Sequence, residues 1–184
     1  MGCGYGELLL AARQLLPRDA QLAGIEPSTV KRRFAASRGL TLLATPLDDI
    51  PPASFDVVSS VNVISHVPEP VLFLHQVARI LVAGGLLLPI TGNSADIERS
   101  EYPGPLDLPD HLVFFGESSL TSLLERCDFE VLSLDKFRLF FLEPSYLRIL
   151  TNIARRALRR PVVPSDEGGS RSFFVRARTK SATR

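Results

Sequence analysis

The sequence predicts one three-layer α/β domain built on a mainly parallel sheet with helices on both faces. Short apolar runs alternate with segments of helical periodicity along most of the 184 residues, a pattern typical of parallel strands joined by helical crossovers. The composition, 45% hydrophobic and 22% charged with a mean hydropathy of +0.14, excludes disorder as the main state. The longest apolar stretch, residues 80–90, is too short to cross a bilayer.

The first half of the chain contains two helical segments, each followed by a short apolar run. Residues 6–16 have helical spacing up to Pro17, and residues 21–25 form an apolar run that ends at Glu26. Ser28 can cap a second helix that ends at Gly39. Residues 40–44 are the second run, and residues 46–54 are rich in turn formers.

The second half begins with the most strand-like segment, residues 55–63, whose valines are typical of a buried parallel strand. Pro68 and Pro70 open a helix that Gly84-Gly85 should end. The remaining expectations are a strand at 86–91, a loop or lid at 92–109, a helix at 118–127, a strand at 129–134, a basic helix at 144–160 and a last strand at 172–178.

Closely spaced glycines precede the first helix, in the segment Gly2-Cys3-Gly4-Tyr5-Gly6. Such a turn lets the backbone approach a ligand and present free amides to it. Glu26 ends the next apolar run 20 residues after Gly6, where a carboxylate can accept hydrogen bonds from both hydroxyls of a ribose. A tight structural turn would explain the glycines alone, but the glycines, the acid and the alternating pattern together indicate a nucleoside cofactor.

The chain resembles the class I S-adenosylmethionine-dependent methyltransferases, particularly bacterial small-molecule methyltransferases, over nearly its whole length. The matching stretches, beside the glycine turn, are Gly24-Ile25-Glu26-Pro27-Ser28, Ser54-Phe55-Asp56-Val57-Val58, Ile64-Ser65-His66-Val67-Pro68-Glu69-Pro70, residues 78–88, residues 110–115, Ser119-Leu120 and Phe129-Glu130-Val131. The resemblance implies a Rossmann-like three-layer sandwich with an antiparallel last strand. It makes residues 1–91 the cofactor-binding half, and residues 92–184 the lid, the basic helix and the last strands.

The resemblance also implies which residues bind S-adenosylmethionine. The implied contacts are Gly2, Cys3, Gly4 and Gly6 around the methionine part, Glu26 on the ribose, Thr45 to Leu47 against the adenine, and Asn62 beside the transferable methyl group. The sequence departs from the family pattern after the third expected strand, where Ala44-Thr45-Pro46 replaces an acid and Asp48 is the candidate for its displaced equivalent.

A second departure is at the start, where the family's central first strand does not precede the glycine turn. Its neighbours would lose ladder partners and apolar cover. We expect a start assigned too late in the coding sequence, which an in-frame stop codon just upstream would disprove. The alternative is a true fragment with impaired binding.

Methyl transfer from a sulfonium requires alignment of the acceptor, and a hydroxyl acceptor also requires a base. His66, after the fourth expected strand, and His111, after the lid, are the candidate catalytic residues. A helix-entry hydrogen bond is the alternative for His66, a structural role is the alternative for His111, and His75 is assigned to structure. The two cysteines and three histidines have no metal-site spacing, so no metal is expected.

Charge is distributed unevenly along the chain. Residues 1–145 carry 11 basic and 18 acidic side chains, whereas residues 146–184 carry 10 basic and 2 acidic ones. The basic helix, residues 146–160, is expected to cover the substrate cleft, and its second interpretation is peripheral contact with an anionic membrane surface. Nucleic acid is not expected, because the body is acidic. Two cysteines without a disulfide pattern and no signal peptide indicate the cytoplasm; the oligomeric state is not predicted.

These observations predict a methyltransferase that acts on a small molecule, with transfer to oxygen. The alternative is an interaction domain that binds the cofactor without turnover. A nicotinamide-linked oxidoreductase ranks third, because the glycine spacing is tighter than the dinucleotide fingerprint.

Overall fold

The computed structural model of the protein describes residues 1–43, 47–97, 111–139 and 170–180. The elements in chain order are α1 (Glu7–Leu15), β1 (Ala23–Gly24), α2 (Thr29–Ser37), β2 (Thr41–Leu42), η1 (Leu47–Asp49), β3 (Phe55–Val61), η2 (Ile64–His66), α3 (Pro70–Ile80), β4 (Leu81–Gly92), α4 (Glu117–Arg126), β5 (Phe129–Leu139) and β6 (Ser170–Thr179).

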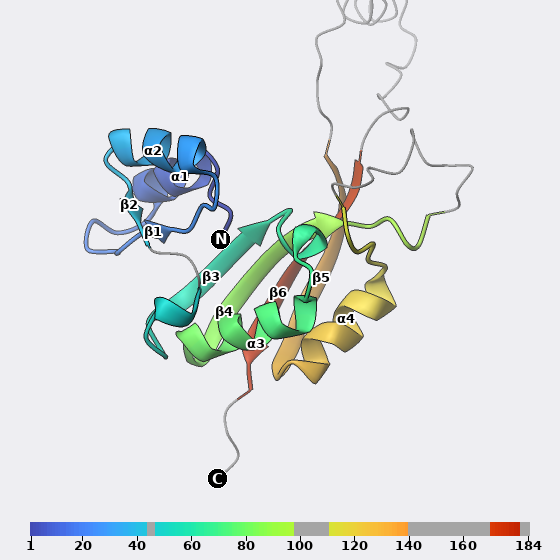
Figure 1. The fold of residues 1–184 in the computed structure, drawn as a ribbon. Coiled ribbons are helices and arrows are strands. Elements are labelled where there is room, and N and C mark those ends of the chain that lie inside the picture. Colours follow the sequence, from blue (N-terminus) through green and yellow to red (C-terminus); the bar gives the residue numbers. More distant parts are fainter. Residues whose placement is uncertain (44–46, 98–110, 140–169, 181–184) are drawn as a thin grey trace, which may run out of the picture.

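The described strands form two sheets. A four-stranded sheet has the order β3-β4-β6-β5, and a two-stranded parallel sheet joins β1 to β2. The pair β3–β4 is parallel, whereas β6 lies between β4 and β5 and is antiparallel to both. Helices α3 and α4 cover one face of the larger sheet (Figure 1). The predicted antiparallel last strand is confirmed, within a sheet that combines parallel and antiparallel pairs.

The segment from α1 to β2 lies beside β3, at one edge of the larger sheet (Figure 1). Among the described strands, β1 pairs only with β2, and β3 pairs only with β4. The amino group of Met1 donates a 2.7 Å hydrogen bond to the carbonyl of Ser59 on the other edge of β3. Among the described strands, no ladder therefore joins β1 to β3, and this is where the sequence predicts that the neighbours of the family's first strand lose a partner.

The boundary between α3 and β4 differs from the sequence prediction. The helix ends at Ile80, the strand begins at Leu81, and Gly84 and Gly85 lie inside the strand. Gly84 has a φ of +76°, and the register against β3 shifts between Phe55 and Val57. These glycines therefore form an irregularity in the strand and do not end the helix.

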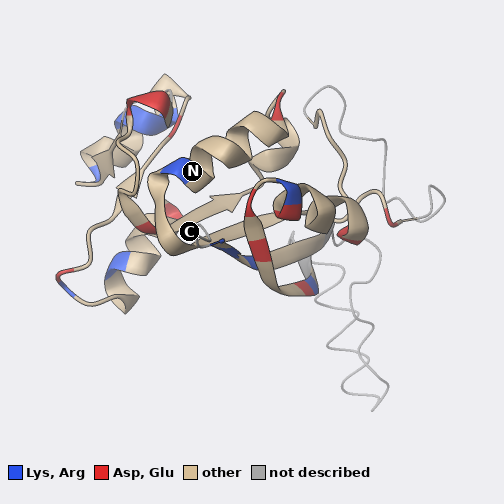
Figure 2. Ribbon diagram, turned by 90° about the horizontal axis from the view of Figure 1, so that it is seen from below, with Lys and Arg blue, Asp and Glu red and all other residues tan. Residues whose placement is uncertain are grey.

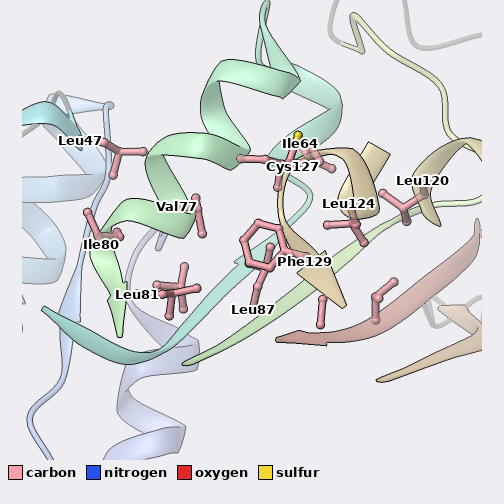
Figure 3. Close-up of a cluster of buried hydrophobic side chains, with 14 of the residues drawn as sticks. Leu47, Ile64, Val77, Ile80, Leu81, Leu87, Leu120, Leu124, Cys127 and Phe129 are labelled. Carbon is pink, nitrogen blue, oxygen red and sulfur yellow. The ribbon is translucent and has the colours of Figure 1, made fainter. Parts of the chain in front are cut away.

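The hydrophobic core lies between the larger sheet and the helices α3 and α4 (Figure 3). Leu74 and Val77 of α3 and Leu120 and Leu124 of α4 are buried against strand residues that include Phe129. On β3 the side chains alternate, so that Val58 is buried while Val57 is 48% exposed. The core thus packs on β3 and β4, and Asn62 and Asn93 directly follow the carboxyl ends of these strands.

The expected lid at 92–109 is described only to residue 97, and the basic helix expected at 144–160 lies outside the described residues. The described acidic and basic residues are interspersed over the fold (Figure 2). In the described part of the chain, no helix has the length and apolar character needed to cross a membrane.

Candidate functional site

The glycine turn and Glu26 lie together. The carboxylate of Glu26 accepts a 2.8 Å hydrogen bond from the amide of Gly4 and a 2.9 Å hydrogen bond from the amide of Ser28. Glu26 is only 6% exposed. A carboxylate has about four lone-pair sites, so these two bonds leave acceptor capacity on both oxygens. The chain folds locally this way because Ser28 caps α2 and turns the backbone directly after Glu26.

The turn requires glycine for two different reasons. Gly4 has a φ of +57°, and a Cβ built on it would meet nothing within 4 Å, so the space above the turn is open. Gly6 has a φ of +93°, and its Cβ would collide with the side chain of Leu40. The first glycine leaves open space above the turn, and the second lets α1 begin close to the segment that leads into β2.

Cys3, between Gly2 and Gly4, connects the turn to the end of β1. Its amide donates a 2.9 Å hydrogen bond to the carbonyl of Ile25, and its thiol lies against Gly24. Burial raises the pKa of the Cys3 thiol, and the nearby negative charge of Glu26 raises it further. The side chain and amide of Cys3 therefore hold the turn against the end of β1.

Asn62 follows β3 on the same side of the molecule as the turn. It adopts a left-handed conformation with a φ of +51°, and its amide donates a 2.8 Å hydrogen bond to the carbonyl of Ile90. A Cβ built on Gly2 would lie 2.6 Å from the side chain of Val63, the next residue. The end of β3 and the glycine turn are thus neighbours, and the side chain of Asn62 is exposed beside them.

His66 and His111 come together although 44 residues separate them. Their ring centroids are 4.5 Å apart and their planes are inclined by 33°. The contact is set by the backbone, because the amides of Leu112 and Val113 both donate to the carbonyl of Ser65. Both rings are half-buried, whereas His75 is exposed on α3. The sequence identified both histidines but not their contact.

Three buried polar side chains near this end of the sheet were missed by the sequence analysis. Within the described residues, the side-chain oxygens of Ser65, Thr91 and Asn93 have no hydrogen-bond partner. Thr91 is near the end of β4, and Asn93 forms a bridge to Phe115. Polar residues directly after an apolar strand were the available signal, because ligands bind at the carboxyl ends of parallel strands.

Of the residues expected near an adenine, Leu47 and Asp48 are among the described residues. Thr45 lies outside the described residues, and the side chain of Leu47 is buried in the hydrophobic core. Asp48 is exposed and accepts a 2.8 Å hydrogen bond from the amide group of Gln76. Among the described residues, no group of three or more histidine, cysteine or acidic side chains could hold a metal ion.

A family model described as "Methyltransferase domain" matches residues 1–134, which include the glycine turn, Glu26 and both histidines. The chain belongs to this methyltransferase family. The predicted family, the Rossmann-like fold class and the cofactor that the family uses, S-adenosylmethionine, agree with this match. Within this methyltransferase domain, the open turn at Gly4 and the spare acceptor sites of Glu26 fit an adenosine-containing cofactor.

Three curated proteins are similar to this methyltransferase domain. A Mycolicibacterium smegmatis protein named "Probable S-adenosylmethionine-dependent methyltransferase" is 34% identical over 137 residues, covering 71% of this chain and 50% of the relative. A ubiquinone biosynthesis O-methyltransferase of Idiomarina loihiensis is 29% identical over 50% of this chain and 41% of its own. A tRNA U34 carboxymethyltransferase of Sodalis glossinidius is 30% identical over 70% of this chain and 43% of its own.

The chain therefore spans about half the length of the curated relatives it matches. Among solved structures, an S-adenosylmethionine-dependent methyltransferase from Mesorhizobium loti is similar, with a TM-score of 0.62 and 20% identity. That match covers 96% of this chain and 88% of the other. At this identity, the likeness supports the fold alone.

Proposed function

We propose that this protein is an S-adenosylmethionine-dependent methyltransferase that transfers a methyl group directly to an oxygen of a small molecule. The observation that carries the proposal is the bond between the Glu26 carboxylate and the Gly4 amide. It fixes a partly satisfied carboxylate beside an open glycine turn. A ribose supplies two hydroxyl donors for the spare lone pairs, and the turn leaves room for the methionine part.

The residues that hold the cofactor in this proposal are those of the turn and its surroundings: Gly2, Cys3, Gly4, Gly6, Glu26, Thr45, Leu47 and Asn62. The cofactor, when bound, supplies the electrophilic methyl group. The chain itself positions the acceptor and excludes water. Asn62 would border the reacting end, because it is exposed at the end of β3 next to the turn.

The His66–His111 pair is the proposed proton acceptor. A hydroxyl nucleophile must lose its proton as the new C–O bond forms, and imidazole does this near neutral pH. Two half-buried rings 4.5 Å apart lie after the carboxyl end of β3. One ring can accept the proton while its neighbour fixes the orientation of the first. The similarity to the Idiomarina relative, which is named an O-methyltransferase, supports transfer to oxygen.

Two measurements test this proposal. Calorimetry should detect binding of S-adenosylhomocysteine and none of NAD, and equal binding of both would contradict the cofactor assignment. Release of S-adenosylhomocysteine from S-adenosylmethionine is then followed with a panel of phenols and catechols, and with bulk tRNA. Turnover with tRNA alone would overturn the small-molecule assignment, which the Sodalis relative makes a necessary control.

A second candidate function is cofactor binding without turnover. It is favoured by the separation of β1 and β3 into different sheets among the described strands, since the proposed cofactor site lies between them. Binding of S-adenosylhomocysteine combined with no methyl transfer to any acceptor class would select this candidate.

A further inference from the structure

Tyr5, between Gly4 and Gly6 in the glycine turn, lies against α2. Its ring makes an edge-to-face contact with Phe34, with the ring centroids 5.3 Å apart and the planes inclined by 87°. The Lys31 ammonium lies 6.0 Å from the centroid of the Tyr5 ring. Lys31 and Phe34 are three residues apart in α2 and therefore lie on one face of the helix. That face contacts the turn itself.

Arg38, directly after the last residue of α2, holds the backbone of the same turn. Its Nη1 donates to the carbonyl of Tyr5 at 3.2 Å and to the carboxylate of Glu7 at 3.2 Å. The carbon of its guanidinium lies 5.7 Å from the centroid of the Phe34 ring. One guanidinium thus contacts the turn, the first residue of α1 and the aromatic side chain that packs on Tyr5.

The turn has more backbone freedom than an ordinary loop, because it contains three glycines and all three have positive φ values. Glycine loses more conformational entropy on ordering than any other residue. The bonds of Cys3 and Gly4 to Ile25 and Glu26 hold the turn on the side of β1. The contacts of Tyr5 hold it on the side of α2. A binding site that is ordered before its ligand arrives binds that ligand more tightly.

We propose that Arg38 is a positioning residue that orders the glycine turn for the cofactor. This inference rests on the proposed function, in which the turn surrounds the methionine part. Arg38 acts through the carbonyl of Tyr5 and has no contact with the cofactor in this proposal. Its charge strengthens the bond to the carbonyl, and its flat guanidinium can pack on the Phe34 ring. A lysine would keep the charge and a donor but lose the planar group.

The first measurement is the affinity for S-adenosylhomocysteine, by calorimetry on the wild type, Arg38→Ala, Arg38→Lys and the control Arg13→Ala. Arg13 is also exposed, and its guanidinium donates to a backbone carbonyl outside the turn, that of Gly39, at 2.9 Å. We expect about tenfold weaker binding by Arg38→Ala and a smaller loss in Arg38→Lys. Arg13→Ala should bind as the wild type does.

The second measurement needs no ligand. Cys3 lies in the turn, whereas Cys127 is fully buried in the hydrophobic core. Iodoacetamide therefore reaches Cys127 when the core unfolds, but it reaches Cys3 also when the turn alone opens. The ratio of the Cys3 rate to the Cys127 rate should rise about tenfold in Arg38→Ala and stay unchanged in Arg13→Ala. A role for Arg38 in general stability alone would raise both rates together and leave the ratio unchanged.

An unchanged labelling ratio or an unchanged affinity in folded Arg38→Ala overturns the inference. If Arg38→Ala does not fold, Arg38→Lys decides by the same two measurements, with smaller changes expected in the same directions. Failure of the wild type to bind S-adenosylhomocysteine would instead overturn the proposed function. The labelling ratio would then still decide whether Arg38 orders the turn, so the two failures are distinguishable.

Discussion

The amide of Gly4 donates to the carboxylate of Glu26 across 22 residues of sequence, at 2.8 Å. A further hydrogen bond fixes each of these groups. The Cys3 amide donates to the carbonyl of Ile25, and the Ser28 amide donates to the second carboxylate oxygen of Glu26. These hydrogen bonds join the glycine turn to the end of β1, so the position of the turn depends on Gly4 and Glu26 together.

Replacing Glu26 by glutamine should weaken cofactor binding more than it weakens the fold. The new NH₂ group cannot accept the bond from Gly4 or Ser28, and the charge that strengthens bonds to ribose hydroxyls is lost. We expect the dissociation constant of S-adenosylhomocysteine to rise by about 10- to 100-fold in calorimetry. Glu130→Gln, which removes an exposed pair with Arg178, is the matched control. Equal affinities in the two variants would remove Glu26 from the site.

Gly4→Ala and Gly39→Ala form a second matched pair. Both glycines have a positive φ, +57° and +72°, and a Cβ would meet nothing within 4 Å at either. Each substitution should therefore lower the free energy of unfolding by about 1 kcal/mol through backbone strain alone. Only Gly4→Ala should also weaken S-adenosylhomocysteine binding, because its methyl group enters the open space above the turn. Parallel binding losses in both variants would show that strain, not ligand contact, explains the effect.

The histidine pair should behave as a unit in catalysis. His66→Ala and His111→Ala should each lower kcat by about 100-fold or more while leaving the affinity for S-adenosylhomocysteine near the wild-type value. Because the rings are 4.5 Å apart, the double variant should lose less than the product of the single losses. His75→Ala, exposed on α3, is the control. Unchanged turnover in both single variants would remove the general-base proposal.

The Cys3 thiol should be a slow, ligand-sensitive target for alkylation. Burial raises its pKa, so little thiolate exists at neutral pH and labelling by iodoacetamide should accelerate as the pH rises above the ordinary thiol range. Because the folded state disfavours the thiolate, the free energy of unfolding should fall as the pH rises from the ordinary thiol pKa through the higher pKa of the folded state. Fast labelling at pH 7 would contradict this environment.

The same labelling experiment has an internal control. Cys127 is fully buried, and burial raises its pKa as well, so it should resist iodoacetamide as long as the protein is folded. In Cys127→Ser, which isolates Cys3, mass spectrometry should show protection by S-adenosylhomocysteine but not by NAD. Absence of protection would place the bound ligand away from the turn.

Most elements followed from local signals. Ser28 and Gly39 bound α2, and the periodicity of residues 118–127 predicted α4 to within one residue. The strands β1 and β2, with two residues each, are shorter than the apolar runs that predicted them. The sequence predicts that Gly84 and Gly85 end α3, but β4 runs through both glycines because it pairs with β3 on either side of them.

The candidate site was predictable where residue type and spacing carry the chemistry. Glu26 stood out because an acid at the end of a short strand, soon after a glycine turn, has few structural reasons to be there. The contact between His66 and His111 depends on two amides that donate to the Ser65 carbonyl, and no periodicity encodes that arrangement.

The position of β6 affects how the chain must be made. Residues 170–179 fill the middle of the larger sheet, between β4 and β5, and contribute Phe173 and Val175 to its interior. During synthesis, β3, β4 and β5 leave the ribosome before the strand that joins them exists. The edges of β4 and β5 that pair with β6 therefore stay unpaired until residues 170–179 have been made, so a premature stop codon before residue 170 should yield an aggregate.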